Sequence, residues 1–204
     1  MIGDCTAVVF AGGKSQRMGQ DKAGIVLDEN GDETLLQRAI ATVRPLFAEV
    51  VVSVAHPRAD LSLRQVCDGI GDAGPLAGLC SALAQTRTPW IFALATDLPF
   101  VAPALILALA ARRENPDAAK AVVPISGGYP QPLLAFYSRA GLAELQMQLQ
   151  NFGKRSVRAA LAELEVRYVD EAELRASDPG LRSFFDLDTP QDLAAARQLP
   201  KVNT

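Results

Sequence analysis

The chain has 204 residues, of which 49% are hydrophobic and 21% charged, and its formal net charge is −3. This length and hydrophobic content suit one α/β domain with a substantial core. The small negative net charge excludes nucleic-acid binding through a broadly basic surface, so local positive charge has to bind any anionic ligand. No apolar run reaches the roughly 18 residues that a membrane-spanning helix needs. We therefore predict a single domain over residues 1–204, with neither nucleic acid nor membrane among its partners.

Cysteine usage and the first residues indicate the compartment. Cys5, Cys67 and Cys80 are far apart and odd in number, and the chain contains one histidine. These features are unlike those of a zinc site or a disulfide framework, so we expect small buried thiols in a reducing environment. The segment 1–4 lacks the basic region of a signal peptide. We therefore predict a cytoplasmic location.

The first predicted strand, residues 6–11, runs directly into a glycine-rich loop that carries three cations, Lys14, Arg17 and Lys22. Glycines let backbone N–H groups approach a ligand closely, and basic side chains match phosphate oxygens, so this loop predicts a phosphate-binding site. It is not a Walker A loop, because Val8 stands where that motif requires glycine. The spacing of its glycines also excludes the G-x-G-x-x-G dinucleotide fingerprint. The alternative is an ordinary solvated loop.

Apolar strands alternate with amphipathic helices along the remaining chain, which predicts a mostly parallel sheet covered on both faces. The expected fold is a three-layer α/β/α domain with one antiparallel strand, residues 133–137. The other expected strands are residues 50–54, 90–95, 121–125 and about 183–186. One expected helix begins at Thr34, and another follows a glycine loop and runs through residues 81–83. Further helices are expected over about 103–115, 140–150 and 156–164, and a last one begins near residue 191.

Asp97 is the most informative acid, because it follows the fully apolar strand 90–95. It should lie at the carboxyl end of a central strand, where open α/β sheets bind ligands. An unpaired carboxylate there would be costly, and a Mg²⁺ ion bridging it to nucleotide phosphates would remove that cost. The alternative is a role as cap of the next helix.

Two further segments leave open alternatives. The loop 68–78 is rich in small residues, which would let a purine ring lie against backbone, but a tight turn before a closely packed helix explains the glycines equally well. Near the C-terminus, Asp186 and Asp188 could hold a second metal or repel a bound phosphate. Asp188 could instead cap the helix that follows Thr189.

The pattern A-G-G-x-S-x-R-M-G-x-D-K at residues 11–22 resembles the signature loop of nucleotidyltransferases that make nucleoside-diphosphate conjugates. It is most similar to that of the molybdenum cofactor guanylyltransferases, which join GMP to molybdopterin, and the resemblance extends from residue 6 to about residue 196. It implies a Rossmann-like nucleotidyltransferase fold, GTP and molybdopterin as substrates, Mg²⁺ as cofactor, and possible contacts with other cofactor-biosynthesis proteins or target molybdoenzymes.

The resemblance also implies roles for individual residues. Arg17 and Lys22 would be catalytic, Asp97 would bind both the metal and the nucleotide, and the acceptor side would be formed by residues further along the chain. The implied nucleotide-binding residues are Phe10, Ala11, Gly12, Gly13, Lys22, Ser53, Asp68 and Asp97. The implied acceptor-binding residues are Gln131, Lys154, Arg155, Asp186 and Asp188.

This chain departs from the guanylyltransferase pattern at three of these positions. Ser53 stands where the better-known pattern has asparagine, and Asp186 and Asp188 stand where asparagines are usual. Acids in the last segment are more similar to cytidylyltransferases. The alternatives are therefore a cytidylyltransferase or sugar-phosphate nucleotidyltransferase of the same fold, and a nucleotide-binding protein without turnover.

Overall fold

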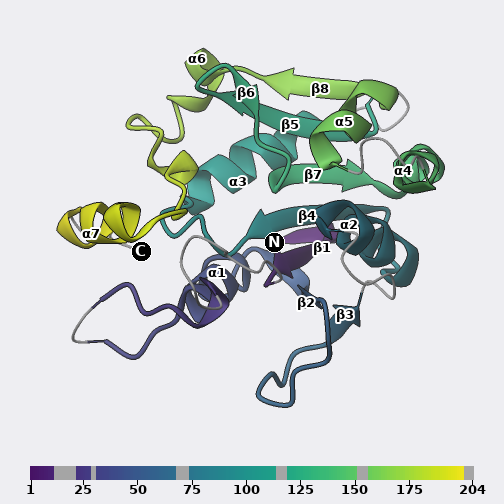
Figure 1. Cartoon of the computed structure of the whole chain (residues 1–204). Coiled ribbons are helices and arrows are strands. Elements are labelled where there is room, and N and C mark those ends of the chain that lie inside the picture. The colour runs from purple at the N-terminus through teal and green to yellow at the C-terminus, as the bar shows by residue number, and fades with distance from the viewer. Residues whose placement is uncertain (12–21, 29–30, 68–73, 114–118, 151–155, 200–204) are drawn as a thin grey trace.

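Eight strands form one sheet in the order β3-β2-β1-β4-β7-β5-β6, with β8 paired to the other side of β5 (Figure 1). The computed structural model describes residues 1–11, 22–28, 31–67, 74–113, 119–150 and 156–199. The strands are β1 (Ile2–Phe10), β2 (Phe47–Val54), β3 (Gln65–Cys67), β4 (Trp90–Ala95), β5 (Ala121–Ser126), β6 (Tyr129–Pro130), β7 (Leu134–Ser138) and β8 (Val166–Val169).

The sheet is mostly parallel, as the sequence predicts. Strands β3, β2, β1 and β4 are mutually parallel, and β8 is parallel to β5. Strand β7 is antiparallel to both of its neighbours, β4 and β5, which confirms the predicted antiparallel strand within one residue at each end. The two-residue strand β6 adds a second, short antiparallel pairing to β5. As a result, β1, β2, β4 and β5 all end at the same edge of the sheet.

Helices connect the strands and cover the sheet. The α-helices are α1 (Leu35–Val43), α2 (Gly74–Gln85), α3 (Pro103–Ala110), α4 (Leu142–Gln150), α5 (Val157–Ala160), α6 (Glu171–Leu174) and α7 (Pro190–Gln198). The 3₁₀ turns are η1 (Lys22–Gly24), η2 (Ala111–Arg113), η3 (Arg139–Gly141), η4 (Leu161–Glu163) and η5 (Arg182–Phe184). Thr34 caps α1 in a capping box with Gln37, and Pro103 occupies the first turn of α3. In the described part of the chain, no helix combines the length and apolar character needed to span a membrane.

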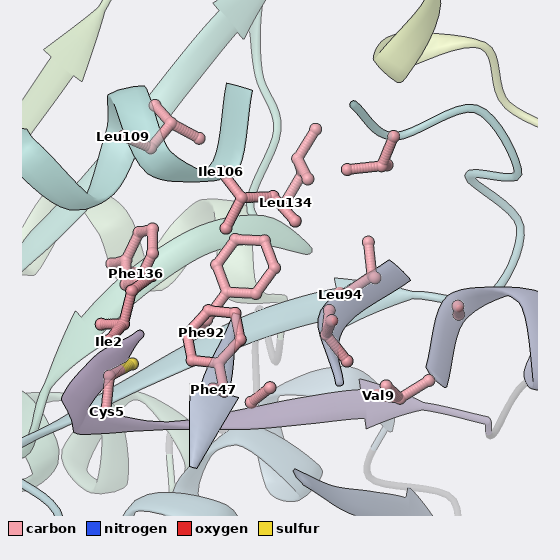
Figure 2. Packing of buried hydrophobic residues seen from close by; sticks show 14 of the residues in the cluster. Ile2, Cys5, Val9, Phe47, Phe92, Leu94, Ile106, Leu109, Leu134 and Phe136 are labelled. Carbon is pink, nitrogen blue, oxygen red and sulfur yellow. The ribbon is translucent and has the colours of Figure 1, made fainter. Parts of the chain in front are cut away.

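The two faces of the sheet bury separate hydrophobic clusters, which establishes the three-layer arrangement. Along β1, Ala7 and Val9 pack into a cluster with α1 and α3, whereas Val8 and Phe10 pack into a cluster with α2, α4 and α5. This alternation follows from the two-residue period of a strand. The first cluster contains a group of three aromatic rings, Phe47, Phe92 and Phe136, beneath Ile106 and Leu109 of α3 (Figure 2). Cys5 and Cys80 are buried and free, as the sequence predicts, whereas Cys67 is free but only partly buried.

A third, smaller cluster attaches the C-terminal segment to the site edge. It joins Ile25 and Leu27, Leu35 of α1, Phe100, and Leu187 and Ala196 from the C-terminal segment. The guanidinium of Arg197 on α7 also donates a hydrogen bond to the carbonyl of Leu27 at 3.1 Å. Helix α7 therefore lies beside the segment that precedes α1, far from it in sequence (Figure 1).

Several predicted element boundaries are wrong. The expected strand near residues 183–186 is the 3₁₀ turn η5, because the Asp178 carboxylate accepts hydrogen bonds from the backbone N–H groups of Arg182 and Ser183 and Leu181 adopts a left-handed conformation, with φ 50°. The expected helix 103–115 leaves the α conformation after Ala110, and the expected helix 156–164 does so after Ala160. Strands β3, β6 and β8 and helix α6 were not predicted, since each has only two to four residues.

Candidate active site at the carboxyl edge of the sheet

The ends of β1, β2 and β4 bring three predicted site segments together. Phe10, the last residue of β1, is in register with Ser53 of β2 and Ala95 of β4. The Ala11 N–H donates to the Ser53 carbonyl at 3.0 Å, and the Thr96 hydroxyl donates to the Phe10 carbonyl at 3.2 Å. Phe10, Ala11, Ser53 and the segment that carries Asp97 therefore meet at one edge, as parallel-strand topology predicts.

Asp97 lies two residues beyond β4, and its side chain is 27% exposed. It does not cap α3, because Ala102 occupies the position before that helix. Instead, its carboxylate accepts a hydrogen bond from the ammonium of Lys22 at 3.0 Å. The predicted position is confirmed, and the cost of a half-buried carboxylate is offset by an ion pair with this lysine.

Lys22 is the centre of an ion-pair network. Its Nζ atom lies 3.0 Å from Asp97 Oδ2 and 2.6 Å from Asp188 Oδ1, and its side chain is only 14% exposed. Burial acts to lower the pKa of Lys22, but the hydrogen bonds and negative charges of Asp188 and Asp97 outweigh it, so the pKa is raised above its ordinary value. Lys22 is therefore a fixed positive charge at this edge of the sheet.

Three carboxylates gather around this charge. One oxygen each of Asp97, Asp186 and Asp188 can be chosen so that all three lie within 4.8 Å of one another. Asp186 is exposed as a whole residue, yet local desolvation of its carboxyl group, followed by the negative charges of Asp97 and Asp188, raises its pKa from 3.8 to about 6. Because the folded protein holds this proton more tightly than the unfolded chain, Asp186 lowers the folding stability as pH rises from 3.8 to about 6.

The donor set fits a hard divalent cation. Mg²⁺ takes oxygen ligands at about 2.1 Å, so its opposite ligands lie about 4.2 Å apart. Three carboxylate oxygens within 4.8 Å of one another are close to that spacing, and Mg²⁺ usually completes its shell with water or phosphate oxygens. Asp97, Asp186 and Asp188 are therefore the described residues able to hold such an ion at this edge.

The C-terminal segment reaches the site through backbone contacts that the sequence analysis did not identify. The Leu187 N–H donates to the Asp97 carbonyl at 2.9 Å, and the Ser183 hydroxyl accepts the N–H of Ala102 at the start of α3. Thr189, not Asp188, caps α7, in a capping box with Asp192. The capping role that the sequence left open for Asp188 is thus wrong. The Thr-Pro-x-Asp spacing carries the signal that would have placed the cap at Thr189.

The predicted base-binding loop also differs from expectation. Gly74 to Gly78 form the beginning of α2, so the helix begins earlier than predicted. A Cβ atom on Gly78 would lie 2.7 Å from the Ser53 hydroxyl and 3.1 Å from the Phe10 ring, which explains the glycine by close helix–sheet packing. Ser53 itself is 5% exposed. Ser53, Phe10 and Gly78 therefore form one packed group at the site edge.

Gln131 lies on the same edge, within the turn that connects β6 to β7. Its side-chain amide donates to the carbonyls of Tyr129 and Ser126, at 3.3 and 3.4 Å. Leu133, two residues later, accepts a hydrogen bond from the Ala95 N–H at 2.8 Å. The structure thus gives Gln131 a local role in the turn. The remaining predicted site residues, Gly12, Gly13, Arg17, Asp68, Lys154 and Arg155, lie outside the described residues.

Comparison with solved structures identifies the fold class. The crystal structure of molybdopterin-guanine dinucleotide biosynthesis protein A from Archaeoglobus fulgidus matches with a TM-score of 0.82 and 26% identity, over 95% of this chain and 97% of that one. The 2-C-methyl-D-erythritol 4-phosphate cytidylyltransferase from Thermus thermophilus matches with a TM-score of 0.58 and 21% identity, over 93% and 96% of the two chains. The fold is therefore that of the nucleotidyltransferases.

Sequence comparison narrows this class to a family. A family model described as the MobA-like NTP transferase domain matches residues 7–166. Two relatives named probable molybdenum cofactor guanylyltransferase, from Pelotomaculum thermopropionicum and Chloroflexus aggregans, are each 37% identical to this chain. Their alignments cover 94% and 92% of this chain and 91% of each relative. The chain belongs to the MobA-like NTP transferase family, which confirms the resemblance seen in the sequence.

Proposed function

We propose that this protein, acting as a single nucleotidyltransferase domain, transfers GMP from GTP to the terminal phosphate of molybdopterin. The products are molybdopterin guanine dinucleotide and pyrophosphate. The names of its relatives support the substrates. The observation that carries the proposal is the convergence of Lys22 with Asp97 at the carboxyl edge of the sheet, at the end of the loop that resembles the family signature. Partner proteins in cofactor biosynthesis and a cytoplasmic location are part of the same proposal.

The chemistry requires positioning and charge neutralisation more than proton transfer. The acceptor phosphate of molybdopterin is already ionised at neutral pH and attacks the α-phosphate of GTP, forming a new P–O bond as the bond to pyrophosphate breaks. No general base is needed for this step. Lys22, with its ammonium held at a defined position, would neutralise triphosphate oxygens and the departing pyrophosphate, as would Arg17.

Magnesium is the proposed cofactor. Asp97 would hold it, with Asp186 close enough to contribute an oxygen. The ion would supply positive charge that offsets the negative charge of the phosphates. Residues of the chain supply the other interactions with the nucleotide. Lys22 would orient the phosphates, and the group formed by Phe10, Ser53 and Gly78 would bound the space proposed for the base.

A second candidate function rests on the acids of the C-terminal segment. Asp186 and Asp188 lie beside Asp97, on the metal side of the site, where phosphates would be bound. The guanylyltransferase pattern has asparagines at these two positions, so this chain carries two additional negative charges there. This difference favours a cytidylyltransferase or a sugar-phosphate nucleotidyltransferase. We rank it second because the acids do not belong to the Phe10, Ser53 and Gly78 group proposed to contact the base.

Pyrophosphate release tests these functions directly. The protein is incubated with Mg²⁺ and each of the four nucleoside triphosphates, with and without molybdopterin. Release that requires both GTP and molybdopterin supports the proposal, whereas release with CTP supports the second candidate. Nucleotide binding without release under any condition would refute GMP transfer to molybdopterin and would leave a transferase with another acceptor or a nucleotide-binding protein without turnover.

A further inference from the structure

The ammonium of Lys22 is shared unequally by two carboxylates from distant parts of the chain. Asp188 Oδ1 lies 2.6 Å from Lys22 Nζ, and Asp97 Oδ2 lies 3.0 Å from it. Charge-assisted hydrogen bonds strengthen as they shorten. The closer partner is thus Asp188, which comes from the C-terminal segment and not from the strand that carries the proposed metal ligand.

Asp188 is held in place by its own backbone and by that of its neighbours. The Asp188 N–H donates to the Asp192 carboxylate at 3.1 Å, and the Thr189 N–H donates to the same oxygen at 2.7 Å. On the other side, the buried Leu187 donates its N–H to the Asp97 carbonyl. The carboxylate of Asp188 is therefore presented to Lys22 from a fixed position, although its side chain is 48% exposed.

This arrangement resolves a conflict in the proposed site. In the proposed site, Asp97 would both pair with Lys22 and ligate a cation. An ammonium and a metal ion compete for the same carboxylate oxygens. A second anchor for Lys22 would keep its charge in the site while Asp97 serves the cation. Asp188 has the distance and the fixed backbone for this task.

We infer that Asp188 is a positioning residue for Lys22: it holds the ammonium where it can neutralise the nucleotide phosphates, independently of Asp97. The inference rests on the proposed function and replaces the acceptor-binding role that the sequence resemblance implied for Asp188, because it places this residue on the nucleotide side of the reaction. An acceptor contact and a lysine anchor predict different couplings between Asp188 and Lys22.

A double-mutant cycle separates these roles. Asp188→Ala removes the anchor, and it should lower kcat/KM for GTP by about tenfold or more, on the scale of a misplaced charged group. In a Lys22→Met background the same substitution should change kcat/KM by less than about threefold, because the group that it positions is already absent. The loss of kcat/KM should be smaller for Asp188→Asn than for Asp188→Ala, because the amide keeps an oxygen that can accept a hydrogen bond from Lys22. Equal losses in the two backgrounds would overturn the inference, because Asp188 would then act through the metal or the acceptor and not through Lys22.

Binding without metal provides a readout that does not depend on turnover. Calorimetric titration of GTP in the presence of EDTA should show weaker binding to the Asp188→Ala variant than to the unsubstituted protein, and equally weak binding to the Lys22→Met and double variants. Asp60→Asn is the matched control, since it removes an exposed carboxylate from an ion pair with Arg58 at 2.9 Å. Unchanged metal-free affinity in Asp188→Ala would refute the anchor. Failure of the unsubstituted protein to transfer GMP would instead refute the proposed function, and the binding cycle would still decide the role of Asp188.

Discussion

Substituting alanine at Gly78 tests the packed group at the base side of the site. A Cβ atom at this position would lie 2.7 Å from the Ser53 hydroxyl oxygen and 3.1 Å from Cε1 of Phe10. The first distance is shorter than side chains tolerate, and Ser53 is 5% exposed, so its hydroxyl has little room to move. We therefore expect Gly78→Ala to strain the contact between α2 and β2.

Two opposing effects set the magnitude. Overpacking in a well-packed region costs about 1–3 kcal/mol. Alanine in place of glycine within a helix stabilises it by about 1 kcal/mol. The expected net effect is a loss of roughly 0–2 kcal/mol in unfolding free energy. In a Ser53→Ala background the closest contact is absent, so the Gly78→Ala substitution should cost at least about 1 kcal/mol less than in the unsubstituted protein.

Urea denaturation of the four proteins of this cycle measures the coupling, provided that the m-values agree. Gly24→Ala is the control, because no neighbouring atom lies within 4 Å of the Cβ that it would introduce, and it should change stability by less than about 0.5 kcal/mol. If Gly78→Ala has the same effect whether residue 53 is serine or alanine, the close approach of α2 to β2 is not as described.

Three further predictions concern the charged site. Lys22→Ala should slow turnover by roughly a hundredfold, the scale of one lost charge-stabilising contact. It should also lower the unfolding free energy by about 1–2 kcal/mol, because two carboxylates lose their shared cation. Steady-state kinetics and urea titration measure these two effects, and unchanged turnover would remove Lys22 from the site. Asp97→Asn should keep the fold and lose most Mg²⁺-dependent activity, because an amide is a much weaker ligand for a hard cation; equal affinity for Mg²⁺ and GTP in titration calorimetry would contradict this. Asp186→Asn should stabilise the protein at pH 8, with the gain shrinking as pH falls through about 6 toward 3.8, since protonation there removes the same charge; a gain that stays constant across this pH range in urea titrations would refute the assigned pKa.

The sequence predicted the sheet well where strands are long and apolar. The strands β1, β2, β4, β5 and β7 were placed within a few residues, and their alternation with helices fixed the parallel topology. The segment before α7 was misread because its two phenylalanines favour a strand. The side chain of Asp178 accepts two N–H groups there and forms a 3₁₀ turn. Such side-chain-to-backbone bonds compete with regular structure and leave no periodic pattern in the sequence.

The site was predictable where topology alone places a residue. Asp97 follows a central strand, so its position at the carboxyl edge of the sheet needed only the strand assignment. The partnership of Lys22 with Asp188 joins residues 166 positions apart and depends on how the C-terminal segment docks against Leu27 and Phe100. No local pattern encodes that docking, so the grouping of three carboxylates, two of them paired with Lys22, emerged only from the structure.

The identity of the transferred nucleotide tests the account most directly. The protein is given equal concentrations of GTP and CTP with Mg²⁺ and molybdopterin, and mass spectrometry quantifies the two dinucleotide products. We expect molybdopterin guanine dinucleotide to predominate, because a site that hydrogen-bonds the edge of guanine leaves its polar groups unpaired with another base, and such losses are worth on the order of a hundredfold in kcat/KM. Predominance of the cytosine dinucleotide would contradict the guanylyl assignment while leaving the fold and the role of Asp97 in place.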